Sequence, residues 1–291
     1  VKNYPMNSDV IVQYTYDNPT PQNRGRSGIT DPRSVNITLR HSFLKVPDND
    51  YMPRLDDPRV GYFTTRVTDM TSTKVAPYRD MIHRWNLKKK KPLEKLSEPV
   101  EPVVFWIENT TPDEFRPAVE EGVLAWNKAF EKAGFENAVQ VKIQPDDAEW
   151  DAGDIRYNVI RWTSSPSPPF GGYGPSFVNP RTGEILGADI MMEYVYFTNR
   201  VKYDYLFKQE PAEFDENNCN AGEFIHQGNL FGTTAINFVS NKELLAKELI
   251  RQSFGRLVLH EVGHTIGLNH NFKSSYLHDN VDIHNKELTK K

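Results

Sequence analysis

The amino-acid sequence predicts an α+β fold, in which a twisted mixed β-sheet with a long packing helix and a second long helix follows a β-rich segment. Three observations predict it. Strand-like runs dominate up to about residue 75, strands and helices alternate from residue 103 onward, and a long helix with apolar flanks begins near Lys242. Hydrophobic residues make up 38% of the 291 residues, so the chain can bury a sizeable core.

The first part of the chain reads as β-rich. Strand patterns cover Val10–Tyr14, Val35–Leu39 and Val60–Val67, and clusters of Pro, Asp and Asn separate them as turn signals. Residues 78–87 are expected to form a short helix. The lysine- and proline-containing stretch 88–102 then reads as a linker. We therefore expect a β-rich N-terminal segment with its linker over residues 1–100, followed by a second domain over 101–291.

The second domain is expected to open with a strand and a long helix. Val103–Ile107 is a compact apolar strand. Thr111 is a suitable N-cap, and Pro112 fits the first helical position. Apolar residues then recur at three- and four-residue spacing to about Ala133, which predicts one buried helix face. Gly134 is a fitting C-terminal stop.

Further strands are expected after this helix. Val139–Ile143 alternates as a half-buried strand, and Ile155–Trp162 is another. A loop rich in Pro, Ser and Gly spans 164–175, and Gly183–Met192 reads as a turn into a strand. Residues 198–240 are polar and irregular before the last long helix begins.

That last helix carries a pattern of histidines with the spacing of a metal site. His260 and His264 are four residues apart, so both rings leave the same face of a helix and their nitrogens can converge on one cation. Glu261 follows the first histidine, where its carboxylate can reach a metal-activated water as general base. Gly267 accepts left-handed backbone angles, so the chain can reverse there and return His270 as a third ligand.

This donor set predicts zinc. Neutral imidazoles suit a borderline-soft cation, and three protein ligands leave the open fourth position that a catalytic zinc site needs. The alternative is a helix with surface histidines, but it does not explain the positions of Gly267 and His270. The helix is also expected to be largely buried, because apolar residues flank the motif: Leu257, Val258, Leu259, Val262, Ile266 and Leu268.

The run His260-Glu261-x-x-His264-x-x-Gly267-x-x-His270 resembles the metzincin consensus. Together with the order of elements, the sequence looks like the large bacterial zinc-dependent metalloproteases found chiefly in Bacteroidota. The resemblance implies a zincin-like catalytic subdomain, zinc-dependent endopeptidase activity on a protein or peptide substrate, and a secreted, periplasmic or cell-surface location. It also implies that residues 183–192 form the edge strand above the active-site cleft, where an extended substrate pairs by strand addition.

The sequence departs from this family in one respect. Metzincins have a methionine turn after the third histidine, but none of the six methionines follows His270. We therefore expect the C-terminal subdomain within residues 101–291 to be truncated. The chain begins at Val1, so we also expect it to be an internal segment or a processed form of a longer protein.

Other function classes receive less support. The formal net charge of −4 and the single short lysine run give no sign of a nucleic-acid partner, and no apolar run is long enough to span a membrane. The acids Asp146, Asp147, Asp151 and Asp154 are a candidate calcium site, although they lack an EF-hand pattern, and we favour a solvated loop. Two alternatives to an endopeptidase stay open: a zinc hydrolase of non-peptide substrates, and a catalytically incomplete zinc-binding scaffold that binds a partner through its β-rich part.

Overall fold

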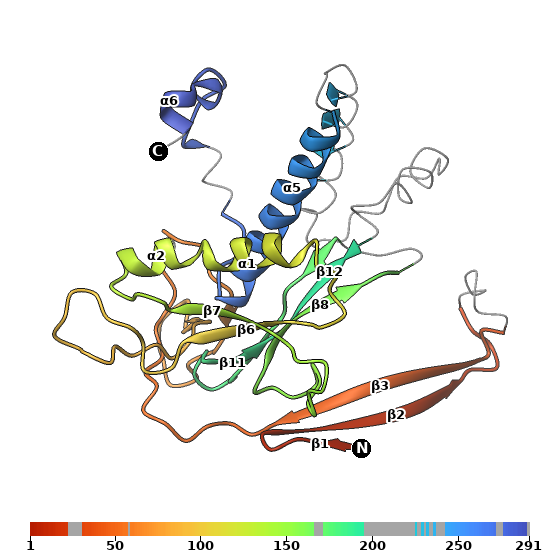
Figure 1. Cartoon of the computed structure of the whole chain (residues 1–291). Helices are drawn as coiled ribbons and strands as arrows, with labels where there is room; N and C mark the ends of the chain where they lie inside the picture. Colours follow the sequence, from red (N-terminus) through yellow and green to blue (C-terminus); the bar gives the residue numbers. More distant parts are fainter. Residues whose placement is uncertain are drawn as a thin grey trace.

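The computed structural model describes residues 1–22, 31–57, 59–165, 171–194, 242–271 and 276–289, with short stretches between 225 and 236. The stretch predicted to be irregular, 198–240, therefore lies largely outside the described residues. Helices pack on one face of a mixed sheet, and a long β-ribbon extends from the opposite side (Figure 1). The predicted α+β fold is confirmed.

The central sheet has five strands in the order β7-β6-β8-β12-β9. Strands β6, β7, β8 and β12 run parallel, and β9 pairs antiparallel with β12, which makes the sheet mixed as predicted. Along the inner strand Val103–Ile107 buried residues alternate with partly exposed ones, as expected where helices cover one face of the sheet. The bounds are β6 (Val103–Ile107), β7 (Val139–Ile143), β8 (Asn158–Thr163), β9 (Gly172–Tyr173) and β12 (Ile190–Glu193).

The prediction for residues 183–192 was wrong in its placement. Two strands form there: β11 (Ile185–Ala188) pairs with β10 (Ser176–Val178), while β12 lies inside the sheet between β8 and β9. The side chains of Ile190 and Met192 are at most 1% exposed, as an internal strand requires. The edge strand next to β12 is instead β9, which lies in the stretch predicted to be a loop.

The predicted helix after Thr111 is divided into α1 (Arg116–Leu124) and α2 (Asn127–Lys132). A tighter step separates the two helices, because the backbone N–H of Trp126 bonds to Val123, three residues earlier. The N-cap of α1 is Phe115 and makes no side-chain cap, so the prediction of Thr111 as N-cap was wrong. Gly134 does end the helical stretch, with a φ of 94°.

The predicted long helix is α5 (Lys242–Thr265), whose N-terminal end extends beyond the sheet in Figure 1. It crosses α1 closely, because a Cβ atom added at Gly122 would lie 2.7 Å from the carbonyl oxygen of Gly255. The core lies between the sheet and these two helices. Its residues are Val103, Phe105, Ile107, Ala118, Val119, Val123, Val139, Ile160, Ile190, Met192, Phe254, Leu257, Val258 and Val262.

The N-terminal region begins with a three-stranded sheet of β1 (Lys2–Asn3), β2 (Asn7–Asp17) and β3 (Ser34–Leu44). Strands β2 and β3 pair along their whole length as an antiparallel ribbon that projects away from the rest of the molecule (Figure 1). Next come the short paired strands β4 (Thr64–Thr65) and β5 (Met81–Ile82). The helix predicted over 78–87 was wrong, because this stretch is extended and pairs with residues 64–68.

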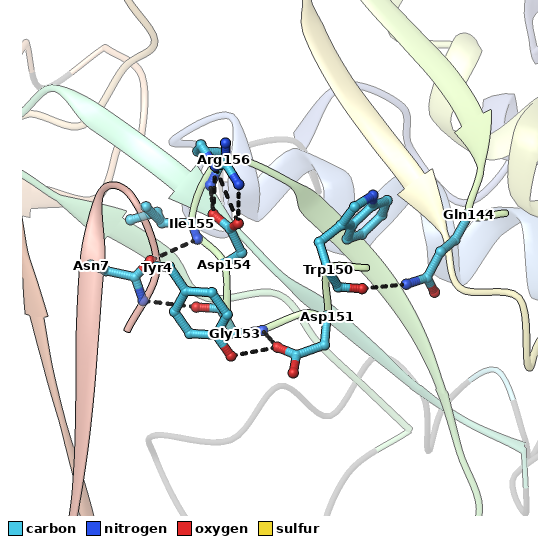
Figure 2. Close-up of polar contacts among 9 residues, drawn as sticks. All are labelled: Tyr4, Asn7, Gln144, Trp150, Asp151, Gly153, Asp154, Ile155 and Arg156. Atoms are coloured by element: carbon cyan, nitrogen blue, oxygen red, sulfur yellow. Dashed lines mark hydrogen bonds and ion pairs between the residues drawn. The ribbon is translucent and has the colours of Figure 1, made fainter. Parts of the chain in front are cut away.

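The base of the ribbon is fixed to the loop between β7 and β8 (Figure 2). The Tyr4 hydroxyl donates to an oxygen of Asp151 at 2.6 Å, and the Asn7 amide donates to the Gly153 carbonyl at 2.8 Å. Asp151 also pairs with Lys2, and Asp154 pairs with Arg156 at 2.6 Å. These two carboxylates of the proposed calcium cluster thus have protein partners, and the structure gives no support for calcium there.

The chain ends with a short 3₁₀-helix, η3 (Asp282–His284), and α6 (Lys286–Thr289). No helix among the described residues is long and apolar enough to cross a membrane.

Candidate metal centre

The end of α5 and the turn after it build the site. The backbone N–H of Gly267 donates to the His264 carbonyl at 3.0 Å, and that of Leu268 donates to the Gly263 carbonyl at 3.0 Å. These two bonds make a Schellman motif, which needs a left-handed residue at its bend. Gly267 supplies it with a φ of 101°. The predicted helix stop is confirmed, and the chain then leads back to His270.

The structure brings the three predicted histidines together. The Nε2 atoms of His260 and His270 are 3.2 Å apart, and one ligand atom from each of His260, His264 and His270 lies within 4.8 Å of the others. Ligands around a tetrahedral zinc at 2.0–2.1 Å would be separated by about 3.3 Å. The arrangement therefore fits a zinc ion with small adjustments of the rings.

The tautomer of His264 is set by the turn. Its Nδ1 lies 2.9 Å from the carbonyl oxygen of Leu268, which can only accept a hydrogen bond. Nδ1 therefore carries the proton, and Nε2 presents its lone pair to the centre of the cluster. Such an outer partner both orients a metal-binding imidazole and makes it a better ligand.

The surroundings also keep the histidines neutral. Burial, followed by the neighbouring His264 and His270, lowers the pKa of His260 to about 4. Burial likewise lowers the pKa of His264, although its bond to Leu268 opposes this shift. Since metal binding needs an unprotonated imidazole, both side chains are ready to bind a cation near neutral pH.

Glu261 follows His260 in α5 and has a buried carboxylate. The residue is 1% exposed, and neither carboxylate oxygen makes a hydrogen bond of normal geometry within the described parts of the chain. Burial raises the pKa of Glu261 to about 7, and the backbone amide of Gly174 opposes part of that rise. A buried carboxylate without strong partners is costly unless a cation or a water approaches it.

The edge strand β9 passes directly over Glu261. A Cβ atom at Gly172 would lie 2.7 Å from Oε1 of Glu261, and one at Gly174 would lie 2.7 Å from its backbone oxygen. Glycine is therefore required at both positions for the strand to approach α5. Sequence reasoning missed these residues, although the run Gly171-Gly172-Tyr173-Gly174 was a signal of close backbone approach.

A tryptophan from the step between α1 and α2 fixes the opposite side of the motif. The Trp126 indole N–H donates to the Leu259 carbonyl at 2.9 Å, and a Cβ atom at Gly263 would lie 2.9 Å from the indole ring. Gly263 thus lets Trp126 pack against the helix between the two helical histidines.

Among the residues that the structure describes, His260, His264 and His270 are the group of His, Cys, Asp and Glu side chains with metal-binding geometry. The structure places the four acids of the candidate calcium site in no such group.

Comparisons with known proteins agree with this geometry. Residues 242–291 match the family model described as Met-zincin, and residues 1–90 match one described as Domain of unknown function (DUF5117). Searches of the curated proteins and of the solved structures found no significant match. Residues 242–291, which carry the three converging histidines, are therefore similar to Met-zincin domains, and the histidines fit the zinc site of that family.

Proposed function

We propose that the protein is a zinc-dependent endopeptidase with Glu261 as its general base. The observation that carries the proposal is the convergence of His260, His264 and His270, with the buried carboxylate of Glu261 on the residue that follows His260. A structural zinc site would need a fourth protein ligand and no carboxylate base.

The residues of the chain divide the chemistry between them. The three imidazoles would hold zinc, which when bound lowers the pKa of a water to about 7 and polarises a peptide carbonyl. The Glu261 carboxylate takes a proton from the attacking water and delivers it to the nitrogen of the leaving amine. Its burial supports this role, because a raised pKa lets one carboxylate both accept and return a proton near neutral pH.

The sheet supports a peptide as substrate. Strand β9 is the terminal strand of the five-stranded sheet and lies over Glu261, so an extended peptide added along it would place a backbone carbonyl near the site. Backbone pairing of this kind tolerates many side chains. We therefore propose the β9 edge, and not residues 183–192, as the substrate-binding strand.

The test compares two Glu→Gln variants on the same helix. Glu261→Gln should keep about one zinc per chain, measured by elemental analysis, and lose on the order of 10²- to 10⁴-fold in cleavage of a mixed peptide library. Glu248→Gln, which changes a partly exposed residue of α5 that pairs with Arg251, should keep both zinc and activity.

Two outcomes would contradict the proposal. An active Glu261→Gln protein would remove Glu261 from the role of base. Wild-type protein that binds zinc and cleaves no peptide would favour a zinc-binding scaffold instead.

A further inference from the structure

The turn that carries His270 is bonded to a segment far upstream in the chain. The backbone N–H of Phe63 donates to the Gly267 carbonyl at 2.9 Å, and that of Asn269 donates to the Gly61 carbonyl at 3.1 Å. Between these bonds the intervening residues face each other in an antiparallel bridge. A short ladder thus joins the turn to the N-terminal region.

Two side chains of the same region contact the motif. The Phe63 ring lies 5.5 Å from the His264 ring, centroid to centroid, at an angle of 56°. The Trp85 indole N–H donates to the Thr265 carbonyl at 2.9 Å, in the last turn of α5. Gly61, Tyr62, Phe63 and Trp85 are called the turn support below.

Backbone hydrogen bonds join the turn support to neighbouring strands. The backbone N–H of His83 donates to the Phe63 carbonyl at 2.8 Å, next to the paired strands β4 and β5. Arg84 then bonds to the hairpin beside the central sheet, because its N–H donates to Gly183 at 3.1 Å and its carbonyl accepts from Ile185 at 2.9 Å. The turn support is therefore built into the same body as the sheet and can resist displacement of the turn.

We infer that the turn support positions His264 and His270 for metal binding. This gives the N-terminal region matched by a domain of unknown function a role in the metal centre. The inference rests on the proposed function in one respect, that zinc is the ion which the histidines bind. Phe63 and Trp85 are positioning residues, since they act through the histidine turn.

Geometry explains why such support matters. Asn269 and His270 are exposed and lie beyond the helix cap, so the turn must be ordered by contacts outside α5. If those contacts are weakened, the protein must order the turn at the moment it binds the metal, and affinity falls. Loss of partners that orient metal ligands typically costs about 10- to 100-fold in metal affinity.

The test compares two Phe→Ala variants from the same N-terminal region. Phe63→Ala removes the ring beside His264, while Phe43→Ala removes a ring that is 63% exposed on the ribbon. Zinc affinity is measured by competition of the metal-free proteins against a fluorescent chelator. Phe63→Ala should bind zinc about 10- to 100-fold more weakly, and Phe43→Ala should bind it as wild type does.

Further variants separate positioning from general loss of structure. Phe63→Tyr keeps the ring and should restore the affinity. Trp85→Phe removes the indole N–H but keeps an apolar ring, so it remains informative if Phe63→Ala does not fold. It should weaken zinc binding by about tenfold and alter the visible spectrum of the Co²⁺-substituted protein. Wild-type zinc affinity in folded Phe63→Ala and in Trp85→Phe would overturn the inference.

This readout does not depend on catalysis. A wild-type protein that binds zinc without cleaving peptides would end the endopeptidase proposal and leave the affinity comparison intact. Conversely, if the enzyme is active and its zinc affinity does not change in the Phe63 and Trp85 variants, the proposed function stands and the inferred role of the turn support is refuted.

Discussion

The β2–β3 ribbon and the turn support belong to the same N-terminal region, but only the turn support has described contacts with the metal centre. The ribbon is fixed at its base, and along its length it exposes apolar side chains such as Ile11, Tyr16 and Phe43. The turn support is bonded to the last turn of α5 and to the turn beyond it. A match to one family model over residues 1–90 therefore does not imply that both parts contact the metal centre.

The two regions also shift the pKa of a carboxyl group in opposite directions. Near the outer end of the ribbon, Asp31 is exposed, and hydrogen bonds from Arg33 lower its pKa to about 2. In the metal centre, burial raises the pKa of Glu261 to about 7. On the ribbon, Arg33 stabilises the charged carboxylate of Asp31. In the metal centre, burial destabilises the charged carboxylate of Glu261.

The largest expected effect comes from the point where turn and support meet. Gly267→Ala places a methyl group against the His83 carbonyl at a φ of 101°, so it should cost on the order of 3 kcal/mol of stability and lower zinc affinity at least tenfold. Urea unfolding and chelator competition measure the two effects. Gly255→Ala within α5 meets only an ordinary contact at 3.4 Å and should be neutral or stabilising. Equal behaviour of the two variants would contradict the close packing of turn and support.

A pH experiment sharpens the contrast in charge. The folded-state pKa of Glu261 is raised from 4.5 to about 7, so its favourable contribution is present below pH 4.5 and is lost as the pH rises through 7. In metal-free protein, Glu261→Gln should therefore gain up to about 3 kcal/mol in stability relative to wild type between pH 4.5 and pH 8. Urea unfolding in the presence of a chelator tests this. A difference that does not change with pH would show that the carboxylate titrates normally.

The smallest effects are expected on the ribbon. Asn7→Ala removes the amide bonds to Gly153 and Ile155 at the buried base, and should cost about 1–3 kcal/mol of stability without changing zinc affinity. Tyr16→Ser changes an exposed side chain and should stay within about 0.5 kcal/mol. Thermal unfolding and chelator competition are the measurements. A loss of zinc affinity in either variant would remove the distinction between ribbon and turn support.

The parts of the fold that the sequence predicted are those with local signals. Strands β6, β7 and β8 follow from short apolar or alternating runs, and α5 and its ending follow from the histidine spacing and Gly267. The clustering of the three histidines could be predicted for the same reason. It depends on helix periodicity and on one glycine bend.

The parts that were missed depend on partners distant in sequence. Strand β9 has two residues in a glycine-rich stretch, and only its pairing with β12 makes it a strand. Residues 78–87 have an acceptable helical composition, but pairing with residues 64–68 and bonds to Gly183 and Ile185 hold them extended. Backbone ladders such as Gly61 with Asn269 leave no pattern of side chains, so the sequence alone could not show the turn support.

The separation of Gly61 and Gly267 along the chain bears on how the protein is made. The N-terminal region precedes the histidine motif in the chain, so it leaves the ribosome before the motif does. Contacts between such distant segments form late, because their loop must close before they stabilise anything. The turn that carries His270 therefore gains its backbone bonds to Gly61 and Phe63 only when the motif docks onto that upstream segment.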